Sequence, residues 1–473
     1  MSTPQPVDVL VVGGGSAGCV LAARLSEDPA REVLLVESGP LHTDDWPAEL
    51  LDAGVIPARH IETWQYTSAL TAHRTGHVSR GRVVGGSGAV NGGYFVRATP
   101  TDLDGWGVPG FSYAELLPAF VRSETDADLD GPLHGRHGPM PVQRRARLHP
   151  LSATFTEACR AAGFAEEADK NSGGAPGIGR LPLNVRNGVR VNAAMAYLLP
   201  ALGRPNLTVR AETTVVRVLV EDERATGVEL AGGEMVRAGQ VVLSAGALAS
   251  AHLLLLSGIG PAAQLRSHGL AVHTDLPVGQ GFSDHPDVAV PYTPVEHAPR
   301  PAGTPALEVA LNTPTLELRP YTAPFAELVV GSGGGPRPSL GVALVRPDSR
   351  GELRLRSAEP LAPPELAHHY LEAARDRTAL REGVRLAYEL LRLPDADDQE
   401  LDRMVAANLG TSMHTVGTCA LGDVVDEQFR VHGVAGLRVV DASVVPVVPS
   451  RGPHATVIAL AEHAAARWAD DIS

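Results

Sequence analysis

The chain opens on a short apolar run, a cluster of glycines and a second apolar run. Val7–Val12 is apolar apart from Asp8, as is typical of a strand buried in a parallel sheet. Glycines fill most of 13–18, and residues 19–25 then carry apolar side chains at helical spacing. Val33–Val36 is a second apolar strand. The pattern predicts a strand–helix–strand unit, the smallest unit of a doubly wound α/β sheet.

The turn after the first strand contains three glycines spaced as G-x-G-x-x-G. Gly13 permits a tight turn, Gly15 lets a pyrophosphate approach the backbone, and Gly18 lets the helix pack closely on the strand. The helix N-terminus then directs its positive end at the phosphates. Glu37 follows the second strand, where a carboxylate can accept hydrogen bonds from ribose hydroxyls. The unit predicts dinucleotide binding but does not distinguish NAD from FAD.

A second glycine-rich block occupies residues 81–93. Gly85 and Gly86 remove side chains from this stretch of backbone, and Ser87 and Asn91 supply polar groups beside it. Bare backbone of this kind lets a flat ring or a phosphate lie against the main chain. A glycine-rich loop that binds nothing is the alternative interpretation.

Alternating apolar and polar residues mark another kind of segment later in the chain. Residues 315–319 and 352–356 alternate in this way, which predicts half-exposed strands of an antiparallel sheet. Residues 365–391 follow a helical pattern, and stretches rich in proline and glycine at 293–305 and 332–339 predict loops. We expect the sheet to form a lid, with substrate between the two layers.

Composition and charge exclude several classes of protein. The 473 residues suffice for two or three domains. A net charge of −14 argues against a nucleic-acid partner, because such binding depends on Lys and Arg. The three cysteines are scattered and form no metal-binding spacing, so we expect no metal and a reducing, cytoplasmic location. No apolar stretch suits an integral membrane segment, and the N-terminus resembles no secretion signal.

Two longer blocks resemble the signatures of the glucose–methanol–choline (GMC) family of FAD-dependent oxidoreductases. The first runs from Gly81 to Asp104. The second block is residues 246–260, and it departs from the family signature at Ala251, where the family prefers Pro or Ser. The segment 284–286 (Asp-His-Pro) also resembles the family. The resemblance implies a mixed α/β fold, in which a Rossmann-type FAD-binding domain is interleaved with an antiparallel-sheet substrate domain.

The order of these blocks predicts a division of the chain into two interleaved domains. The FAD-binding domain would be assembled from residues 1–145, 205–285 and 411–473. Residues 146–204 and 286–410 would form the substrate-binding domain.

The resemblance also implies which residues hold FAD. The pyrophosphate would lie at the first glycine turn, the ribose at Glu37, the isoalloxazine beside the second glycine block, the adenine at Val215, and the ribityl–phosphate region at Asp441. Val90 stands where some relatives carry the histidine that tethers the flavin, so we expect non-covalent FAD. The complete predicted set is Gly13, Gly15, Ser16, Gly18, Glu37, Arg82, Gly85, Gly86, Ser87, Asn91, Gly92, Val215, Asp441, Ala442, Ala455 and Thr456.

Two histidines match the catalytic positions of the family. Oxidation of a primary or secondary alcohol to an aldehyde or ketone requires loss of the hydroxyl proton and transfer of a hydride to flavin N5. A neutral histidine can accept that proton, because its ordinary pKa is about 6.5. We predict His414 as the base and His454 as the ligand of the substrate oxygen. His285 is expected to have a structural role. The electron acceptor would be O2 or a redox carrier.

Three alternatives remain open. The compact, arginine-rich chain resembles actinobacterial members of the family, including the mycofactocin-associated dehydrogenases, which reoxidise a peptide-derived redox cofactor and pass electrons to a carrier. The family also contains non-redox flavoprotein lyases. A flavin-binding protein without catalytic activity is the third alternative, and the presence of both His414 and His454 argues against it.

Overall fold

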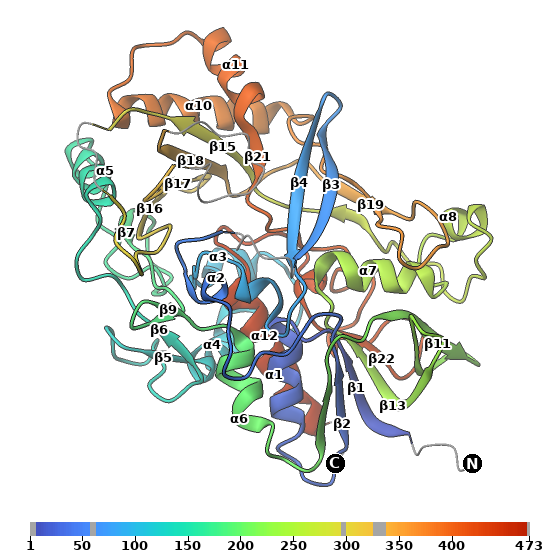
Figure 1. Ribbon diagram of the computed structural model, residues 1–473. Coiled ribbons are helices and arrows are strands. Elements are labelled where there is room, and N and C mark those ends of the chain that lie inside the picture. The colour runs from blue at the N-terminus through green and yellow to red at the C-terminus, as the bar shows by residue number, and fades with distance from the viewer. Residues whose placement is uncertain (1–5, 57–62, 295–298, 325–336, 471–473) are drawn as a thin grey trace.

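The described residues form three large sheets, of seven, five and six strands (Figure 1). The computed structural model describes residues 6–56, 63–294, 299–324 and 337–470. Most of the predicted glycine-rich loop at 332–339 and part of the loop at 293–305 lie outside the described residues. The mixed α/β fold with a parallel sheet core and an antiparallel substrate sheet is confirmed.

The first sheet carries the predicted strand–helix–strand unit. β1 (Val7–Val12) and β2 (Val33–Val36) pair in parallel, with the bounds that the apolar runs predict. The parallel core order is β10-β2-β1-β13-β22, and β13 continues into an antiparallel meander with β12 and β11. The other strands of this sheet are β10 (Leu207–Arg210), β11 (Val215–Glu221), β12 (Arg224–Leu230), β13 (Met235–Leu243) and β22 (Leu437–Val439).

Two helices from opposite ends of the chain pack side by side against this sheet. α1 (Ser16–Leu25) begins three residues before its predicted start, at the glycine turn. α12 (His454–Asp470) lies next to α1, and α4 (Tyr113–Ser123) packs on α12. Ion pairs join the three helices, because Glu462 on α12 binds both Arg24 on α1 and Arg122 on α4. The C-terminal helix is therefore fixed to the last turns of α1 and α4.

The second sheet, here called the lid, contains the strand predicted at 315–319 but not the one predicted at 352–356, which lies in the third sheet. All strand pairs of the lid are antiparallel. Its order is β21-β15-β18-β17-β16-β7. The strands are β7 (Ile178–Arg180), β15 (Pro286–Pro291), β16 (Val309–Asn312), β17 (Leu316–Pro320), β18 (Ser339–Leu344) and β21 (Leu409–Thr411). Helices α5 (Pro150–Ala161), α10 (Ala374–Leu391) and α11 (Asp398–Asn408) cover its outer face around a separate apolar core (Figure 1).

The expected half exposure of residues 315–319 is wrong. Every residue of β17 is buried, including Glu317 and Arg319. The alternation is real, but the polar face meets a network of charged partners inside the protein instead of water. A period of two identifies the two faces of a strand and does not say what covers the polar one.

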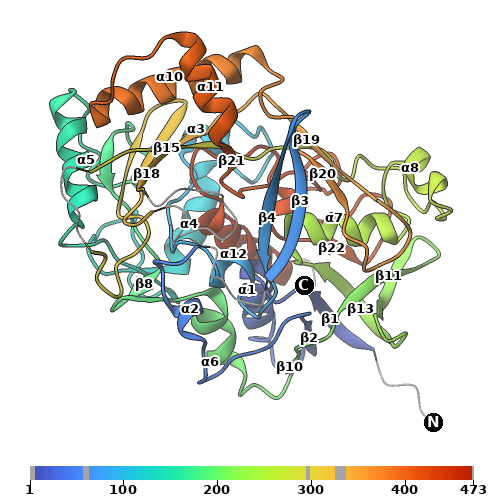
Figure 2. The same ribbon diagram turned by 45° about the horizontal axis from the view of Figure 1, so that its top comes forward.

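A third sheet stands beside the lid, in the order β14-β19-β20-β3-β4. Its long hairpin of β3 (Thr63–Thr71) and β4 (Arg74–Gly81) rises next to β21 and α7 in both ribbon views (Figures 1 and 2). β14 (Gln280–Phe282), β19 (Gly351–Arg354) and β20 (Glu365–Ala367) complete the sheet. The helix predicted from residue 365 therefore begins only at Ala374. Positive φ angles at His369 and Leu371 keep the intervening residues out of a helix.

The remaining elements are short connections, apart from α7. The helices are α2 (Ala48–Leu51), α3 (Pro100–Asp104), α6 (Leu199–Ala201), α7 (Gly246–Leu256) and α8 (Ala262–Ser267), with single turns η1 (Gly86–Ala89), η2 (Ala194–Leu198) and η3 (Ala442–Val444). The strands are β5 (Glu124–Asp126), β6 (Met140–Val142), β8 (Val185–Arg186) and β9 (Val189–Arg190).

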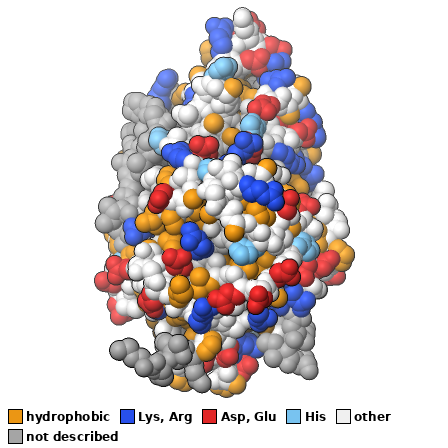
Figure 3. Space-filling model, turned by 90° about the vertical axis from the view of Figure 1, so that its right-hand side faces the viewer, with side chains coloured by type: hydrophobic (Ala, Val, Ile, Leu, Met, Phe, Trp, Pro, Cys, Tyr) orange, Lys and Arg blue, Asp and Glu red, His pale blue; other side chains and the backbone are white. Residues whose placement is uncertain are grey.

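The surface offers no obvious site for a polyanion on the face seen in Figure 3. Acidic and basic side chains alternate over that face and surround a smaller apolar area. Within the described part of the chain, no helix is both long enough and apolar enough to cross a membrane.

Candidate active site

A single large cavity runs from the glycine turn to the lid sheet. Its volume is about 1250 Å³, which exceeds the roughly 300–1,000 Å³ of ordinary small-ligand pockets. One end is lined by Glu37 and Val215, the middle by His414 and His454, and the far end by Arg319 of the lid. The cavity therefore has room for a dinucleotide together with a small substrate.

The two glycine blocks meet at one end of this cavity. A side chain on Gly18 would place its Cβ 1.8 Å from the carbonyl oxygen of Gly13, so α1 can approach the turn only without one. Gly86 has a φ of +56°, and its Cβ would lie 2.6 Å from the Cα of Gly15. The backbones of the two blocks are therefore in direct contact. Together the two blocks form one surface of backbone without side chains, here called the glycine cradle.

The Glu37 carboxylate closes the first glycine turn. Its oxygens accept the backbone N–H groups of Gly14 at 2.8 Å and of Gly39 at 2.9 Å. Burial raises the pKa of Glu37, and these two hydrogen bonds oppose the shift. A carboxylate has about four acceptor positions, so each oxygen retains capacity for a ribose hydroxyl. The residue faces the cavity while it also holds the turn.

Asp441 holds the start of α7, the helix that contains most of the second family signature. Its carboxylate accepts the backbone N–H of Gly246 at 2.8 Å and the hydroxyl of Ser250 at 2.6 Å, which fixes the start of α7. It also accepts the N–H of Ser443 at 2.8 Å. Burial raises the pKa of Asp441, and the bonds to Ser250 and Ser443 oppose that shift. One carboxylate thus joins α7 to η3 at the cavity wall.

Most of the predicted site residues lie on the wall of this one cavity. The lining includes Gly13, Gly15, Ser16, Glu37, Arg82, Gly86, Ser87, Asn91, Gly92, Val215, Asp441, Ala442, His414 and His454. Gly18, Gly85, Ala455 and Thr456 are not among the lining residues. Gly85 packs against the side chain of Asn192. The Thr456 hydroxyl is fully buried and accepts the backbone N–H of Ala98 at 3.2 Å.

His454 begins α12 and presents a hydrogen-bond donor at the cavity. Asn91 accepts the N–H of Gly93 with its Oδ1 at 2.9 Å, which turns its amide nitrogen toward His454 Nδ1 at 3.3 Å. Nδ1 is therefore the acceptor, and the proton of a neutral ring lies on Nε2. Nε2 is buried and has no partner within the described residues. Burial lowers the pKa of His454 to about 4, so the ring is neutral at physiological pH.

His414 lies against a second histidine that the sequence did not identify as functional. Its Nδ1 is 3.0 Å from Nδ1 of His285, and the two rings are nearly perpendicular. This contact leaves Nε2 of His414 as the nitrogen available to a ligand. Burial and the nearby His285 lower the pKa of His414 to about 3. Burial also lowers the pKa of His285, opposed by Asp284. The Asp-His-Pro segment was the only sequence signal for this pairing.

Asp284 fixes the backbones of both histidines. Its Oδ1 accepts the N–H of His285 at 2.7 Å and the N–H of His414 at 2.8 Å. Its Oδ2 accepts the hydroxyl of Thr415 at 2.7 Å and lies 3.3 Å from Nε2 of His368. Burial alone would raise the pKa of Asp284, but His368, His414 and Thr415 hold it below its ordinary value. The carboxylate thus stays charged and positions the pair.

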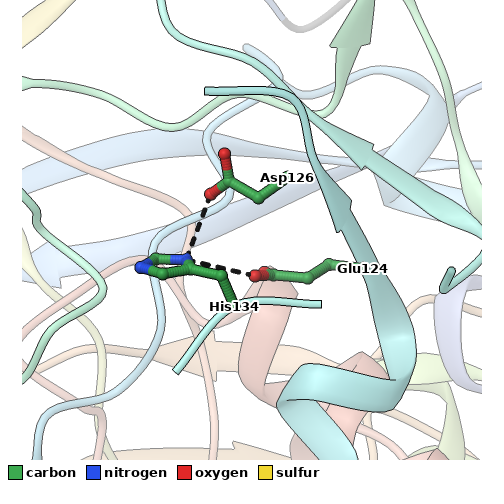
Figure 4. Close-up of side chains that lie close together, drawn as sticks. All are labelled: Glu124, Asp126 and His134. Atoms are coloured by element: carbon green, nitrogen blue, oxygen red, sulfur yellow. Dashed lines mark ion pairs between the residues drawn. The ribbon is translucent and has the colours of Figure 1, made fainter. Parts of the chain in front are cut away.

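Glu124, Asp126 and His134 form a buried cluster away from this cavity (Figure 4). Nδ1 of His134 lies 3.2 Å from Asp126 and 3.6 Å from Glu124. Arginines already neutralise both carboxylates, because Arg97 is 2.6 Å from Glu124 and Arg144 donates to both oxygens of Asp126 at 2.9 Å. We interpret the cluster as an ion-pair network, since a divalent cation there would be repelled by the guanidinium groups.

The His134 network predicts a pH-dependent contribution to stability. The nearby carboxylates of Glu124, Asp169 and Asp126 raise the pKa of His134, and its Nε2 lies within hydrogen-bond distance of Asp169, at 3.1 Å. A raised pKa means that the contribution is complete below the unfolded value near 6.5 and is lost as pH rises through the folded value. We expect His134→Gln to lower the free energy of unfolding by about 1.5–3 kcal/mol at acidic pH, with the deficit shrinking at alkaline pH. Urea unfolding at several pH values measures it, and a pH-independent deficit would contradict it.

The fold and the cavity together define a flavin-dependent oxidoreductase of the GMC class. Residues 7–287 and 347–461 match the two sequence profiles of the GMC oxidoreductases. The chain therefore belongs to the GMC oxidoreductase family and is a GMC-type FAD-dependent oxidoreductase that acts on CH–OH donors.

Several known proteins resemble the chain over nearly its whole length. An uncharacterized GMC-type oxidoreductase of Rhodococcus erythropolis is 44% identical, with 98% of this chain and 99% of the relative covered. The oxygen-dependent choline dehydrogenase of Vibrio vulnificus is 32% identical, with 98% and 94% covered. The crystal structure of pyridoxine 4-oxidase from Mesorbium loti superposes with a TM-score of 0.91 at 31% identity, with 98% and 99% covered.

Proposed function

We propose that this chain holds FAD non-covalently in the cavity and oxidises a primary or secondary alcohol, with His414 as base. The residues present fit the cofactor. The glycine cradle excludes side chains from one end, and Glu37 keeps free acceptor positions there. The buried Nε2 of His454, which has no partner within the described residues, calls for a ligand in the middle of the cavity. When bound, FAD supplies the acceptor for the hydride that leaves the carbinol carbon.

The two histidines divide the work on the substrate oxygen. His454 carries its proton on Nε2 and is neutral, so it can donate a hydrogen bond to the hydroxyl oxygen and orient it. His414 is neutral because burial lowers its pKa, so its free nitrogen can accept the hydroxyl proton. The single observation that carries the proposal is that a neutral donor and a neutral acceptor line the same cavity as the glycine cradle.

His285 acts as a positioning residue for the base. For Nε2 of His414 to accept a proton, its Nδ1 must carry one, and that proton points at Nδ1 of His285 at 3.0 Å. His285 thus selects the tautomer of His414. When His414 takes up the substrate proton, the charged carboxylate of Asp284, which accepts the backbone N–H groups of both residues, offsets the new positive charge.

Non-covalent attachment of FAD predicts that denaturing the protein releases the cofactor. Val90, which is 3% exposed, occupies the position from which a histidine could tether the flavin. We therefore expect acid precipitation of the protein to release all of the yellow chromophore into the supernatant, where its spectrum and mass are those of unmodified FAD. Flavin that stays with the precipitated protein after washing would contradict the prediction.

We also propose an electron acceptor for the reduced flavin and a location for the protein in the cell. The acceptor is O2 or a redox carrier. The narrower link to mycofactocin-associated dehydrogenases has no support among the relatives named above and is not part of the proposal. A cytoplasmic location is included because the three cysteines are all buried and unpaired, as in reducing compartments.

The proposed function is tested by mixing the purified flavoprotein with a panel of primary and secondary alcohols under anaerobic conditions. We expect at least one alcohol to bleach the visible absorbance of the oxidised flavin, because the cofactor itself accepts the hydride. Admission of O2 then distinguishes an oxidase, in which the colour returns rapidly, from a dehydrogenase. A flavin that stays oxidised with every alcohol would favour a lyase or a protein without redox activity.

A further inference from the structure

The far end of the cavity carries an ion pair that the proposed chemistry does not use. Asp287 of β15 and Arg319 of β17 are both on the cavity wall, and the Arg319 guanidinium donates to the Asp287 carboxylate. The hydroxyl of Ser412 joins them, 3.0 Å from each. The two charged residues are 9% and 5% exposed. The pair is therefore a buried, hydrogen-bonded part of the substrate wall.

Asp287 is the carboxylate that a cationic substrate would need. The cavity lining contains three carboxylates among the described residues, Glu37, Asp287 and Asp441. Glu37 and Asp441 bind backbone N–H groups at the proposed cofactor end. Asp287 lies on the lid, and Arg319 already neutralises it. A positively charged alcohol would have to compete with the Arg319 guanidinium for the Asp287 carboxylate. Arg319 belongs to the protein itself and is always present beside Asp287.

The residues behind the pair make Arg319 difficult to displace. Its other terminal nitrogen lies 3.6 Å from Glu317, whose second oxygen accepts the hydroxyl of Tyr94 at 2.7 Å and the amide of Asn312 at 2.9 Å. Asn312 in turn accepts from Lys170, the one lysine of the chain, at 2.8 Å. Every side chain of this network is held by another, so Arg319 cannot easily swing away to expose Asp287.

The rest of the cavity wall adds positive rather than negative charge. β4 contributes Arg74 and Arg80 to the lining, and Arg82 follows the end of that strand, although the protein as a whole carries a net charge of −14. A cationic alcohol would approach these groups without finding an unpaired carboxylate on the described lid. A neutral alcohol loses no such interaction, because the Asp287–Arg319 pair is satisfied before it binds.

We propose that the Asp287–Arg319 pair determines substrate charge, so that this enzyme takes neutral alcohols and rejects those that carry a quaternary ammonium group. This inference rests on the proposed function and names its substrate class. A cation that enters this buried wall gives up its hydration without finding an unpaired carboxylate, and we expect this loss to lower its affinity on the order of a hundredfold.

A pair of nearly isosteric alcohols tests the proposal. Choline and 3,3-dimethylbutan-1-ol differ chiefly in the atom that bears three methyl groups, nitrogen with a charge or carbon without one. Binding of each to the flavoprotein is followed by the perturbation of the oxidised flavin spectrum, which does not require turnover. We expect the wild type to bind the neutral alcohol on the order of a hundredfold more tightly. Tighter binding of choline would overturn the proposal, whether or not either alcohol is oxidised.

Variants of the pair give the decisive comparison. Arg319→Met removes the charge while keeping an unbranched side chain, and it should shift the ratio of affinities toward choline. Arg319→Lys retains the positive charge and should leave the preference unchanged. If Arg319→Met loses its flavin, Asp287→Asn replaces it, and this variant should favour 4-hydroxybutanoate over the neutral alcohol. An unchanged ratio of choline to neutral-alcohol affinity in a flavin-containing Arg319→Met variant would contradict the proposal. An unchanged ratio of 4-hydroxybutanoate to neutral-alcohol affinity in a flavin-containing Asp287→Asn variant would also contradict it.

Discussion

Replacing His414 by alanine is expected to leave FAD bound and to slow flavin reduction by about 10²–10⁴-fold, the usual contribution of a general base. The substitution removes the nitrogen that accepts the hydroxyl proton but leaves the glycine cradle and Glu37 intact. Anaerobic stopped-flow absorbance at saturating alcohol measures the rate. His432→Ala is the matched control, because His432 does not line the cavity and should reduce its flavin at the wild-type rate.

The proposed role of His414 as base also predicts how the rate of flavin reduction depends on pH. Burial lowers the pKa of His414 to about 3, so the base remains unprotonated well below the ordinary histidine pKa. A base must be unprotonated to act, and the acid limb of the rate profile therefore moves to low pH. We expect no fall in the rate of flavin reduction as pH decreases through about 6.5. Unchanged reduction kinetics in His414→Ala would refute the base assignment directly.

Replacing Glu37 by arginine is expected to abolish stable FAD binding. The change removes the acceptor of the Gly14 and Gly39 N–H groups and leaves both without their buried partner. Each such loss costs about 1–3 kcal/mol, and the ribose loses its carboxylate as well. The ratio of flavin to protein absorbance after gel filtration measures retention, and circular dichroism confirms that the chain remains folded.

Glu37→Gln is the control for this prediction. It keeps the shape of the side chain and one carbonyl acceptor, so we expect partial retention of FAD between the wild type and the arginine variant. Full flavin occupancy in Glu37→Arg would show that the ribose contact does not lie at this residue.

The cofactor end of the cavity could be predicted from sequence because its information is local. The strand, the glycine turn and Glu37 all fall within 31 consecutive residues, Val7 to Glu37, and part of the glycine spacing reflects a contact within this stretch. Gly18 illustrates this, since the group that excludes its side chain is the carbonyl of Gly13. The bounds of β1 and β2 agree with the apolar runs for the same reason.

The substrate end could not be predicted in the same way, because its contacts join distant segments. His285 and His414 are 129 residues apart, and nothing in either neighbourhood indicates that their Nδ1 atoms meet. Glu317 and Arg319 alternate with leucines like the residues of any half-exposed strand, yet both are buried against partners from other strands. A periodic pattern identifies a polar face, and only the tertiary structure shows whether water or a counter-ion covers it.

We propose that a hydride leaves the carbinol carbon for the flavin while His414 takes the hydroxyl proton. The most direct measurement compares anaerobic flavin reduction by the best alcohol of the panel and by the same alcohol deuterated at the carbinol carbon. We predict that the flavin is bleached in both cases, more slowly with deuterium, and that His414→Ala slows both reactions. A flavin that stays oxidised with every alcohol, or a wild-type reduction rate in His414→Ala, would contradict the account.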